Sequence, residues 1–314
     1  MGLLTLLLLL FFSAFFTPSL SQRHYSPLNT AYYRRSCPRF EQIMQETTTN
    51  KQINSPTTAA ATLRLFFHDC FVGGCDSSVL ISSTPFNKAE LIRAKTALEL
   101  ACPGVVSCSD ILAIAARNLV VQTGGPFYPV KLGRKDSFVS KASLVEGNLP
   151  RPAMPMDQMI KIFESKGFSI QEMVALSGAH TIGFSHCKEF SSNLYNFNRT
   201  SQSDPSYNPR FAQALRSACG NYQKDPTLSV FNDIMSPNKF DNMYYQNLPK
   251  GLGLLSSDRG LFSDPRTRIH VEEYIRDQNA FFKAFASAMQ RLSEHSVKFG
   301  RSGEIRHRCD AFNN

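Results

Sequence analysis

Pairs of cysteines separated by two residues are missing from this sequence, although it contains eight cysteines. Structural zinc sites usually draw their ligands from such pairs, so zinc binding is not indicated. Lysine and arginine outnumber acidic residues by 34 to 25, but they form no basic tail. We interpret the net charge of +9 as affinity for an acidic extracellular matrix, more than for nucleic acid. The chain has no internal repeat, and no low-complexity segment after its first residues.

Only one long apolar run occurs, and it stands at the start of the chain. Leu3 to Phe16 is strongly apolar, and the small residues Ser19 and Ser21 follow. A membrane-spanning helix needs about 20 apolar residues, so this run is short for an anchor, the alternative interpretation. We interpret residues 1–21 as a signal peptide cleaved near Gln22. A secreted mature chain, free of the membrane after cleavage, is therefore predicted.

Secretion changes what the cysteines indicate. An even number of cysteines in an oxidising compartment predicts four disulfides. Only Cys70 and Cys75 can be paired from the sequence, because the Gly73-Gly74 turn between them lets them approach. A single glycosylation sequon at Asn198 predicts an exposed loop.

Helical patterns dominate the chain, so an all-α protein with long connections is predicted. Ser55 is predicted to cap a helix that has Pro56 at its first position, and Ser169 with Glu172 forms a capping box. One short strand is expected at 130–136. The predicted helices cover residues 38–53, 57–71, 89–102, 107–124, 170–180, 208–219, 241–251 and 280–294.

The segment "RLFFHDCFVGGCD", residues 64–76, combines groups that can carry chemistry. Arg64 and His68 are four residues apart, so they share one face of a helix. A neutral histidine beside a fixed guanidinium can act as a general base next to a positive charge. Asp69 points elsewhere and is not a partner of His68. The alternative is a core histidine with a solvated arginine beside it.

The same segment carries oxygen ligands around its glycine turn. Asp69, Asp76 and Ser78 offer side-chain oxygens, and Val72 and Gly74 offer backbone carbonyls. Hard oxygen ligands of this kind suit calcium. The spacing is not that of an EF-hand loop.

A second motif, "VALSGAHTIGFSHC" at residues 174–187, ends a capped helix with His180. The small residues Ser177, Gly178 and Ala179 beside this histidine would let a flat, bulky group approach. A haem held by a neutral imidazole would fit. His186 is a competing ligand that the motif alone does not exclude.

Together the two motifs resemble those of the plant secretory haem peroxidases. The resemblance extends from "YYRRSCP" to "RHRCD" and includes "GRKD", "FDNMYY" and "LFSDP" between them. It implies one peroxidase domain, residues 22–314, with two helical lobes enclosing one haem b. It also implies a monomeric enzyme. The resemblance favours the cell wall or extracellular space over the vacuole as its location. Such an enzyme reduces hydrogen peroxide and oxidises small phenolic donors in one-electron steps.

On the distal side of the haem, the resemblance implies three roles. His68 would move a proton from one peroxide oxygen to the other, and Arg64 would stabilise the charge on the leaving oxygen. Phe67 would shield the haem edge. Pro150, in "GNLPRP", would offer its carbonyl to aromatic substrates.

On the proximal side, His180 would be the axial iron ligand, in preference to His186. Asp258 would accept a hydrogen bond from the far nitrogen of His180 and make the imidazole more basic. Asp110 and Arg134 would form a buried ion pair.

Two calcium ions and a complete disulfide pattern also follow from the resemblance. The distal ion would be held by Asp69, Val72, Gly74, Asp76 and Ser78, with Glu90 reached through water. The proximal ion would be held by Thr181, Asp233, Ser236 and Asp241, with a carbonyl near Lys239. The implied disulfides are Cys37–Cys102, Cys70–Cys75, Cys108–Cys309 and Cys187–Cys219.

One departure from the family pattern falls after Glu90, where only two residues precede Arg93. The family has roughly fifteen more residues there, a length equal to about four helical turns. That segment normally carries an Asn that accepts a hydrogen bond from His68, and a Ser near a haem propionate. A spliced-out segment, a gene-model error and a genuine short form all explain the gap. Without the Asn, the chain could bind haem with impaired peroxide activity.

Overall fold

The computed structural model describes residues 28–81, 89–195 and 197–313, without the side chains of residues 89–92. The proposed signal peptide lies outside these ranges. Within them the protein is predominantly helical, with one two-stranded sheet, which confirms the predicted all-α class. No helix in the described ranges is both long and apolar enough to cross a membrane.

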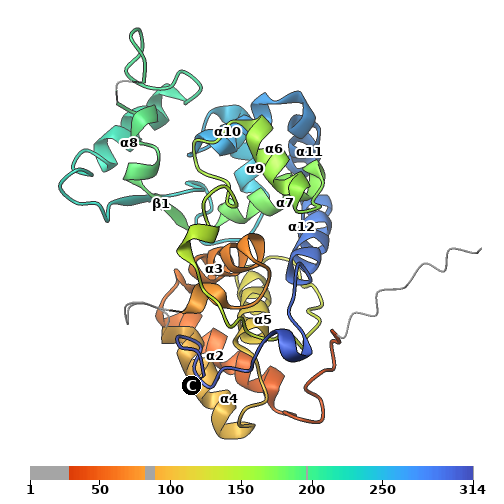
Figure 1. The fold of residues 1–314 in the computed structure, drawn as a ribbon. Coiled ribbons are helices and arrows are strands. Elements are labelled where there is room, and N and C mark those ends of the chain that lie inside the picture. Colours follow the sequence, from red (N-terminus) through yellow and green to blue (C-terminus); the bar gives the residue numbers. More distant parts are fainter. Residues whose placement is uncertain (1–27, 82–88, 196, 314) are drawn as a thin grey trace, which may run out of the picture.

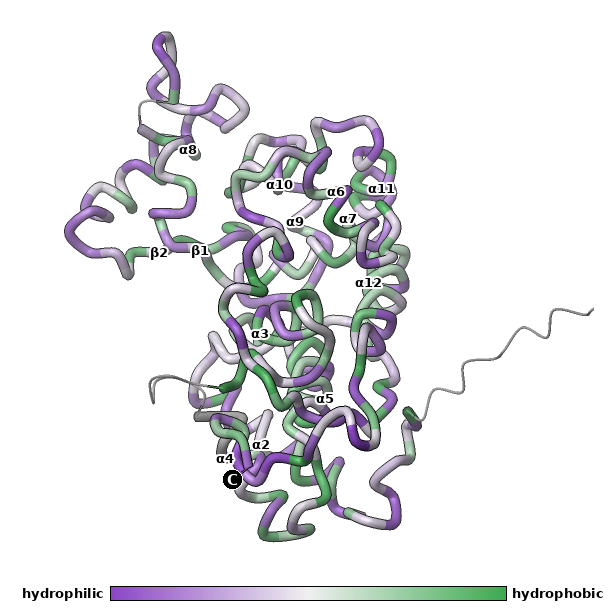
Figure 2. The backbone as a smooth tube through the Cα atoms, in the orientation of Figure 1, coloured by the Kyte–Doolittle hydropathy of each residue, from purple (hydrophilic) through white to green (hydrophobic). Residues whose placement is uncertain are grey.

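Four helices form one half of the molecule, drawn from orange to yellow-green in Figure 1. They are α2 (Phe40–Asn54), α3 (Thr58–Val72), α4 (Ala89–Ala101) and α5 (Cys108–Gln122). The central member is α5, which packs against the other three. Its residues are buried from Cys108 to Val120, because Ile, Leu, Ala and Val cover most of its circumference. The apolar colour along α5 in Figure 2 reflects this composition.

A second group of helices forms the other half. They are α6 (Met156–Ser165), α7 (Ile170–Ser177), α9 (Met243–Asn247), α10 (Ser256–Ser263), α11 (Pro265–Arg276) and α12 (Gln278–Ser293). The long helix α12 packs along α7 and α11, and it also contacts α3 of the first group. It therefore joins the two halves, as the implied two-lobed fold requires (Figure 1).

A smaller unit extends from the second half. Strands β1 (Phe184–His186) and β2 (Ser229–Phe231) pair antiparallel, and α8 (Pro209–Ala218) lies between them in sequence. This unit has its own apolar cluster, which includes the Cys187–Cys219 disulfide. Its helix α8 begins after Asn208, whose side chain accepts hydrogen bonds from the first turn.

All four implied disulfides are present. Cys70–Cys75 closes the glycine turn, as predicted from the sequence. The other three pairs, implied by the resemblance, are Cys37–Cys102, Cys108–Cys309 and Cys187–Cys219. No cysteine in the described part of the chain is free.

The strand predicted at residues 130–136 is wrong as a strand. The segment instead makes isolated bridges to three separate places: Leu132 with Asn29, Lys135 with Lys298, and Asp136 with Glu304. No single neighbouring segment runs beside it long enough for a ladder. Its backbone hydrogen bonds connect the segment near Asn29 with the C-terminal segment that contains Lys298 and Glu304.

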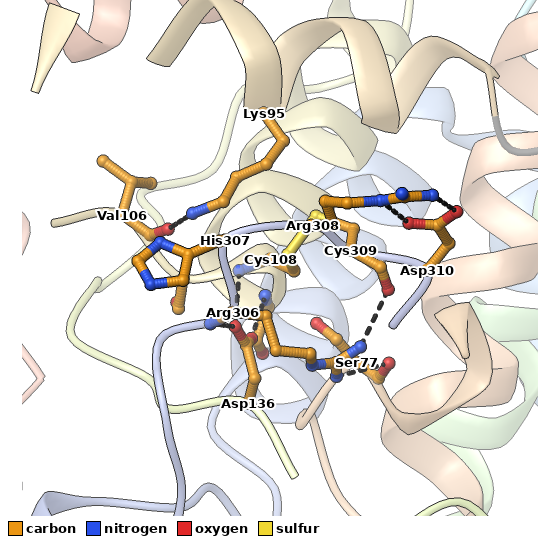
Figure 3. The surroundings of a disulfide bond; sticks show 12 residues. Ser77, Lys95, Val106, Cys108, Asp136, Arg306, His307, Arg308, Cys309 and Asp310 are labelled. Carbon is orange, nitrogen blue, oxygen red and sulfur yellow. Dashed lines mark hydrogen bonds and ion pairs between the residues drawn. A yellow bond between two sulfur atoms is a disulfide. The ribbon is translucent and has the colours of Figure 1, made fainter. Parts of the chain in front are cut away.

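Asp136 stabilises these connections through its side chain. It is fully buried, and its carboxylate accepts hydrogen bonds from the backbone N–H groups of Cys108, Ser109 and Arg306. Figure 3 shows this arrangement beside the Cys108–Cys309 disulfide. The start of α5 is thereby fixed to the C-terminal segment by a covalent bond and by a shared carboxylate.

The start of α3 also differs from the prediction. Ser55 does not cap α3; it terminates α2, and its N–H donates to the carbonyl of Lys51. Helix α3 begins at Thr58, whose hydroxyl donates to the Ser55 carbonyl. The Ser169–Glu172 capping box of α7, in contrast, is confirmed. Helices α6, α10 and α11 were not predicted.

A buried ion pair joins α5 to the loop after it. Arg134 Nη1 lies 2.8 Å from Asp110 Oδ1, and both side chains are fully buried, as the resemblance implied. The Asp110 carboxylate also accepts from the Tyr33 hydroxyl at 2.6 Å and from the Gly133 N–H at 2.7 Å. Burial and the Asp110 charge raise the pKa of Tyr33, so its hydroxyl remains a donor.

We predict that Asp110→Asn lowers the free energy of unfolding by about 3–5 kcal/mol, because it leaves the Arg134 charge buried without a carboxylate. Glu146→Gln breaks the exposed pair with Arg151 and serves as the control. Exposed pairs contribute at most about 1 kcal/mol. Urea unfolding of both variants measures the difference, and equal midpoints would contradict the prediction.

Candidate active site

Helix α3 carries Arg64 and His68 on one face, as predicted. The Arg64 Nε–H donates to His68 Nε2 at 3.4 Å. A nitrogen that accepts a hydrogen bond carries a lone pair, so the proton of the neutral ring lies on Nδ1. Asp69 points away from this face and accepts hydrogen bonds from the backbone of the following loop. The sequence prediction that Asp69 is not a partner of His68 is confirmed.

The environment of His68 favours its neutral form. Burial and the neighbouring Arg64 charge lower the pKa of His68 from 6.5 to about 4. Both causes disfavour a second positive charge at this place. At neutral pH the imidazole is therefore an unprotonated base, with its lone pair on Nε2.

Phe67 precedes His68 and packs into an aromatic cluster. Its ring stacks on Phe71, with centroids 4.7 Å apart, and lies 6.2 Å from Phe163 of α6. The ring centroid of His68 is 6.3 Å away. These contacts fix the Phe67 ring beside His68 and across to the second half of the molecule.

The second histidine, His180, lies in the 3-10 turn Gly178–Thr181 that follows α7. A side chain at Gly178 would collide with Tyr245 and Phe281, so only glycine lets this turn pack so closely. The turn thereby holds His180 at the end of a capped helix, as the sequence predicted.

Asp258 fixes the orientation of His180. His180 Nδ1 lies 2.8 Å from Asp258 Oδ1, which confirms the implied contact. The Tyr244 hydroxyl donates to the same carboxylate at 2.8 Å, and the Leu255 N–H donates at 3.0 Å. Tyr244 was missed from the sequence, where only its place in "FDNMYY" marked it.

Burial alone would lower the pKa of His180, but the charge and hydrogen bond of Asp258 outweigh it, and the pKa is raised. With Nδ1 donating to Asp258, the lone pair of the ring stands on Nε2. That nitrogen has no hydrogen-bond partner among the described residues. An imidazole with a fixed tautomer and a raised basicity is the donor that suits a haem iron.

The two motifs meet in space. Arg64 is near enough to His180 for its charge to act against protonation of the imidazole. In Figure 1, α3 ends the first group of helices on the side that faces α7 and α9. Helix α3, which carries His68, therefore lies next to the part of the second half that holds His180.

The remaining predicted site residues are placed as follows. His186 ends β1, where it is exposed and pairs with Ser229. Pro150 is half-buried in the connection before α6. The side chain of Glu90 lies outside the described residues.

The predicted distal calcium ligands lie between the end of α3 and the turn Ser78–Leu80. The Asp69 carboxylate accepts from the N–H groups of Ser77 at 2.8 Å and Val79 at 3.3 Å. Asp76 Oδ1 accepts from the N–H of Ser78 at 3.0 Å. Burial and the nearby Asp76 charge raise the pKa of Asp69 to about 7. Two buried carboxylates in mutual repulsion fit a cation.

Two further details of this loop fit a bound ion. The Ser77 hydroxyl is buried and has no hydrogen-bond partner in the described ranges. Gly74 has a φ of +105° and packs against the backbone of Ser296, where no side chain would fit. Val72, whose carbonyl was also predicted as a ligand, ends α3.

The predicted proximal ligands are brought together as well. The Ser236 hydroxyl bridges two carboxylates, 3.2 Å from Asp233 Oδ2 and 3.1 Å from Asp241 Oδ1. Thr181 Oγ1 donates to the carbonyl of Lys239 at 3.3 Å and accepts from the Asp241 N–H at 3.4 Å. Burial, followed by the charge of Asp241, raises the pKa of Asp233.

Acidic side chains alone do not form a metal site in either loop. Among the described residues, no three His, Cys, Asp or Glu side chains cluster as a metal site. A cation in either loop would take part of its coordination from hydroxyl and carbonyl oxygens, which is the donor set that calcium accepts.

Comparison with known proteins identifies the family. A sequence model described as "Peroxidase" matches residues 42–277. The chain belongs to the peroxidase family. It is 60% identical to peroxidase 63 of Arabidopsis thaliana, with 99% of this chain and 97% of that protein aligned. Peroxidase 31 of the same plant is 59% identical over 98% of each chain, and peroxidase 65 is 54% identical over 91% and 90%.

This peroxidase is therefore a haem enzyme that acts on hydrogen peroxide and a reducing substrate. The residues present fit the cofactor, because Asp258 holds the Nδ1 proton of His180 and leaves the Nε2 lone pair available to an iron. The alignment with peroxidase 63 spans 326 positions, 12 more than the 314 residues of this chain. That relative therefore has residues that this peroxidase lacks, as a missing segment requires.

We predict that His68 of the haem-free protein titrates near pH 4 and that Arg64→Leu raises this pKa. The rise should be partial, because burial remains. The unfolded chain binds the proton near pH 6.5, so the stability contributed by neutral His68 is present above 6.5 and lost towards pH 4. Histidine NMR titration measures the pKa. Exposed Arg210→Leu is the control, and equal pKa values in both variants would contradict the prediction.

Proposed function

We propose that this peroxidase activates hydrogen peroxide between the His68–Arg64 pair and a haem held by His180, and that it oxidises small phenolic donors. The observation that carries the proposal is a pair of histidines with contrasting partners. One is kept neutral beside a guanidinium, and the other is oriented by a buried carboxylate. Bound haem would supply the iron and the porphyrin that exchange electrons with peroxide and donor.

His68 moves the proton in this proposal. Its Nε2 takes a proton from one oxygen of hydrogen peroxide and returns it to the other, which leaves as water. The lowered pKa keeps Nε2 unprotonated at neutral pH, so it can accept a proton. Arg64 remains charged and adjacent, so it stabilises negative charge on the departing oxygen. Phe67, fixed by Phe71, shields the side of the site.

Asp258 acts through His180. As acceptor of the Nδ1 proton, the carboxylate gives the imidazole anionic character and strengthens Nε2 as a donor to iron. The Tyr244 hydroxyl and the Leu255 N–H hold Asp258 in place. Pro150, half-buried near the second half of the molecule, offers its carbonyl to the aromatic substrate.

Two calcium ions complete the proposed enzyme. The distal loop supplies Asp69, Val72, Gly74, Asp76 and Ser78, with Glu90 through water. The proximal loop supplies Thr181, Asp233, Ser236 and Asp241. Buried, mutually repelling carboxylates in both loops support the two sites.

We further propose that the protein is secreted to the extracellular space or cell wall as a monomer. The apolar first residues and the four disulfides support secretion. Asn198 is exposed, and its carbonyl oxygen accepts from the N–H and hydroxyl of Thr200, as a glycosylated sequon permits. The net charge of +9 supports contact with acidic polysaccharide.

Haem retention and peroxide turnover test the assignment. We predict that His180→Ala abolishes stable haem binding, measured by the Soret band after gel filtration, because it removes the iron ligand. His186→Ala, on exposed β1, should keep the band. His68→Ala should keep haem and lower the first peroxide step by about 10²–10⁴-fold. Loss of haem from His186→Ala alone would overturn the axial assignment.

The missing segment leads to a further prediction. In the described residues, no side-chain carbonyl accepts a hydrogen bond from His68, and the side chain that contacts its ring nitrogen is Arg64. We predict that restoring the segment between Glu90 and Arg93, with the sequence of peroxidase 63, accelerates the first peroxide step in stopped-flow measurements. The reason is that an acceptor for Nδ1–H fixes the His68 tautomer. Equal rates would show that His68 is oriented without it.

A further inference from the structure

Lys298 lies against the distal loop, although it comes from the opposite end of the chain. Its Nζ is 3.1 Å from Asp76 Oδ2. Its backbone is fixed, because its carbonyl accepts from the N–H of Lys135 at 3.0 Å. The Asp76 side chain is 5% exposed, whereas that of Lys298 is 28% exposed. The ammonium group therefore approaches a buried carboxylate from the solvent side.

The other polar groups of the loop show why this lysine matters. Asp69 is satisfied by backbone N–H groups, and Asp76 Oδ1 is satisfied by Ser78. Asp76 Oδ2 has the Lys298 ammonium as its ionic partner. Neighbouring Arg306 directs its guanidinium to backbone carbonyls of Asp76, Ser77 and Cys309, as Figure 3 shows for the last two.

We propose that Lys298 is a tethered counter-cation for the distal loop, which shares Asp76 with calcium and must withdraw its ammonium for the ion to bind fully. The proposal rests on the distal calcium site proposed above. In the calcium-free protein, Lys298 partly neutralises the buried carboxylate of Asp76. In the calcium-bound protein, its charge opposes that of the ion and weakens calcium binding.

The geometry permits this exchange. A lysine carries its charge on a flexible four-carbon stem, so Nζ can move while the backbone stays paired with Lys135. Its partial exposure gives the ammonium a place in water after it leaves Asp76. A charged group of the same sign beside a buried site lowers the affinity for a cation.

Lys298→Met tests the proposal, because methionine keeps most of the stem and removes the charge. Lys298→Arg keeps the charge. Lys131→Met is the matched control, since Lys131 Nζ pairs with Glu294 at 2.9 Å and is similarly exposed, at 36%. Asp76→Asn identifies which calcium isotherm belongs to the distal site. The full-length protein is stripped with chelator, and calcium chloride is titrated by calorimetry.

We expect Lys298→Met to bind distal calcium about tenfold more tightly, within the usual range of coupling between two ligands. Without calcium, it should melt about 3 °C below Lys131→Met, a difference that disappears at saturating calcium. Lys298→Arg should match the wild type in both measurements.

Two contrary results are distinguishable. If Lys298→Met and wild type bind distal calcium with equal affinity, the role of Lys298 is wrong and the calcium site stands. If wild type shows no isotherm that Asp76→Asn removes, the distal calcium site is itself wrong. The proposed competition between Lys298 and calcium for Asp76 is then wrong as well.

Discussion

Asp136 has no exposed surface, and its carboxylate accepts hydrogen bonds from three backbone N–H groups at two distant places in the chain. A carboxylate withdrawn from water needs such partners, and here they are the first turn of α5 and the segment near Arg306. The Cys108–Cys309 disulfide joins the same two segments covalently. The central helix is thereby fixed to the C-terminal segment, and α3, which carries the distal residues, packs against that helix.

The same requirement is met differently at other buried aspartates, and the differences separate structure from chemistry. Asp110 has a guanidinium, a phenol and a backbone N–H, so it is fully compensated. Asp258 also accepts from a phenol and a backbone N–H, those of Tyr244 and Leu255, but its third partner is an imidazole, His180, which it can polarise. Asp69 has backbone N–H groups and the Arg306 charge in its favour, but burial and the Asp76 charge outweigh them, and its pKa rises to about 7. Asp110 therefore stabilises the fold, Asp258 orients the histidine that suits a haem iron, and Asp69 keeps a charge that a cation would stabilise.

Two histidines illustrate how surroundings assign different chemistry to one side chain. His68 is half-buried beside a positive charge, and its pKa falls. His180 is half-buried beside a negative charge, and its pKa rises. Proton transfer needs an imidazole that is unprotonated at neutral pH, and iron ligation needs one that is made more basic.

The sequence by itself determined the local elements of this protein. The spacing of Arg64 and His68 placed them on one helical face, the Ser169–Glu172 box began α7, and the Gly73-Gly74 turn paired Cys70 with Cys75. Such features depend on neighbours within a few residues, so their physics is contained in a short window. The family resemblance supplied the long-range pairs, among them Asp258 with His180.

Only the tertiary structure decided contacts between distant segments. The segment at 130–136 was predicted as a strand, but its neighbours are three separate pieces of chain, so it forms isolated bridges in place of a ladder. Tyr244 on Asp258 and Lys298 on Asp76 left no periodic signal in the sequence. Each depends on how α9, α10 and the chain after α12 pack, and packing joins residues that no local pattern relates.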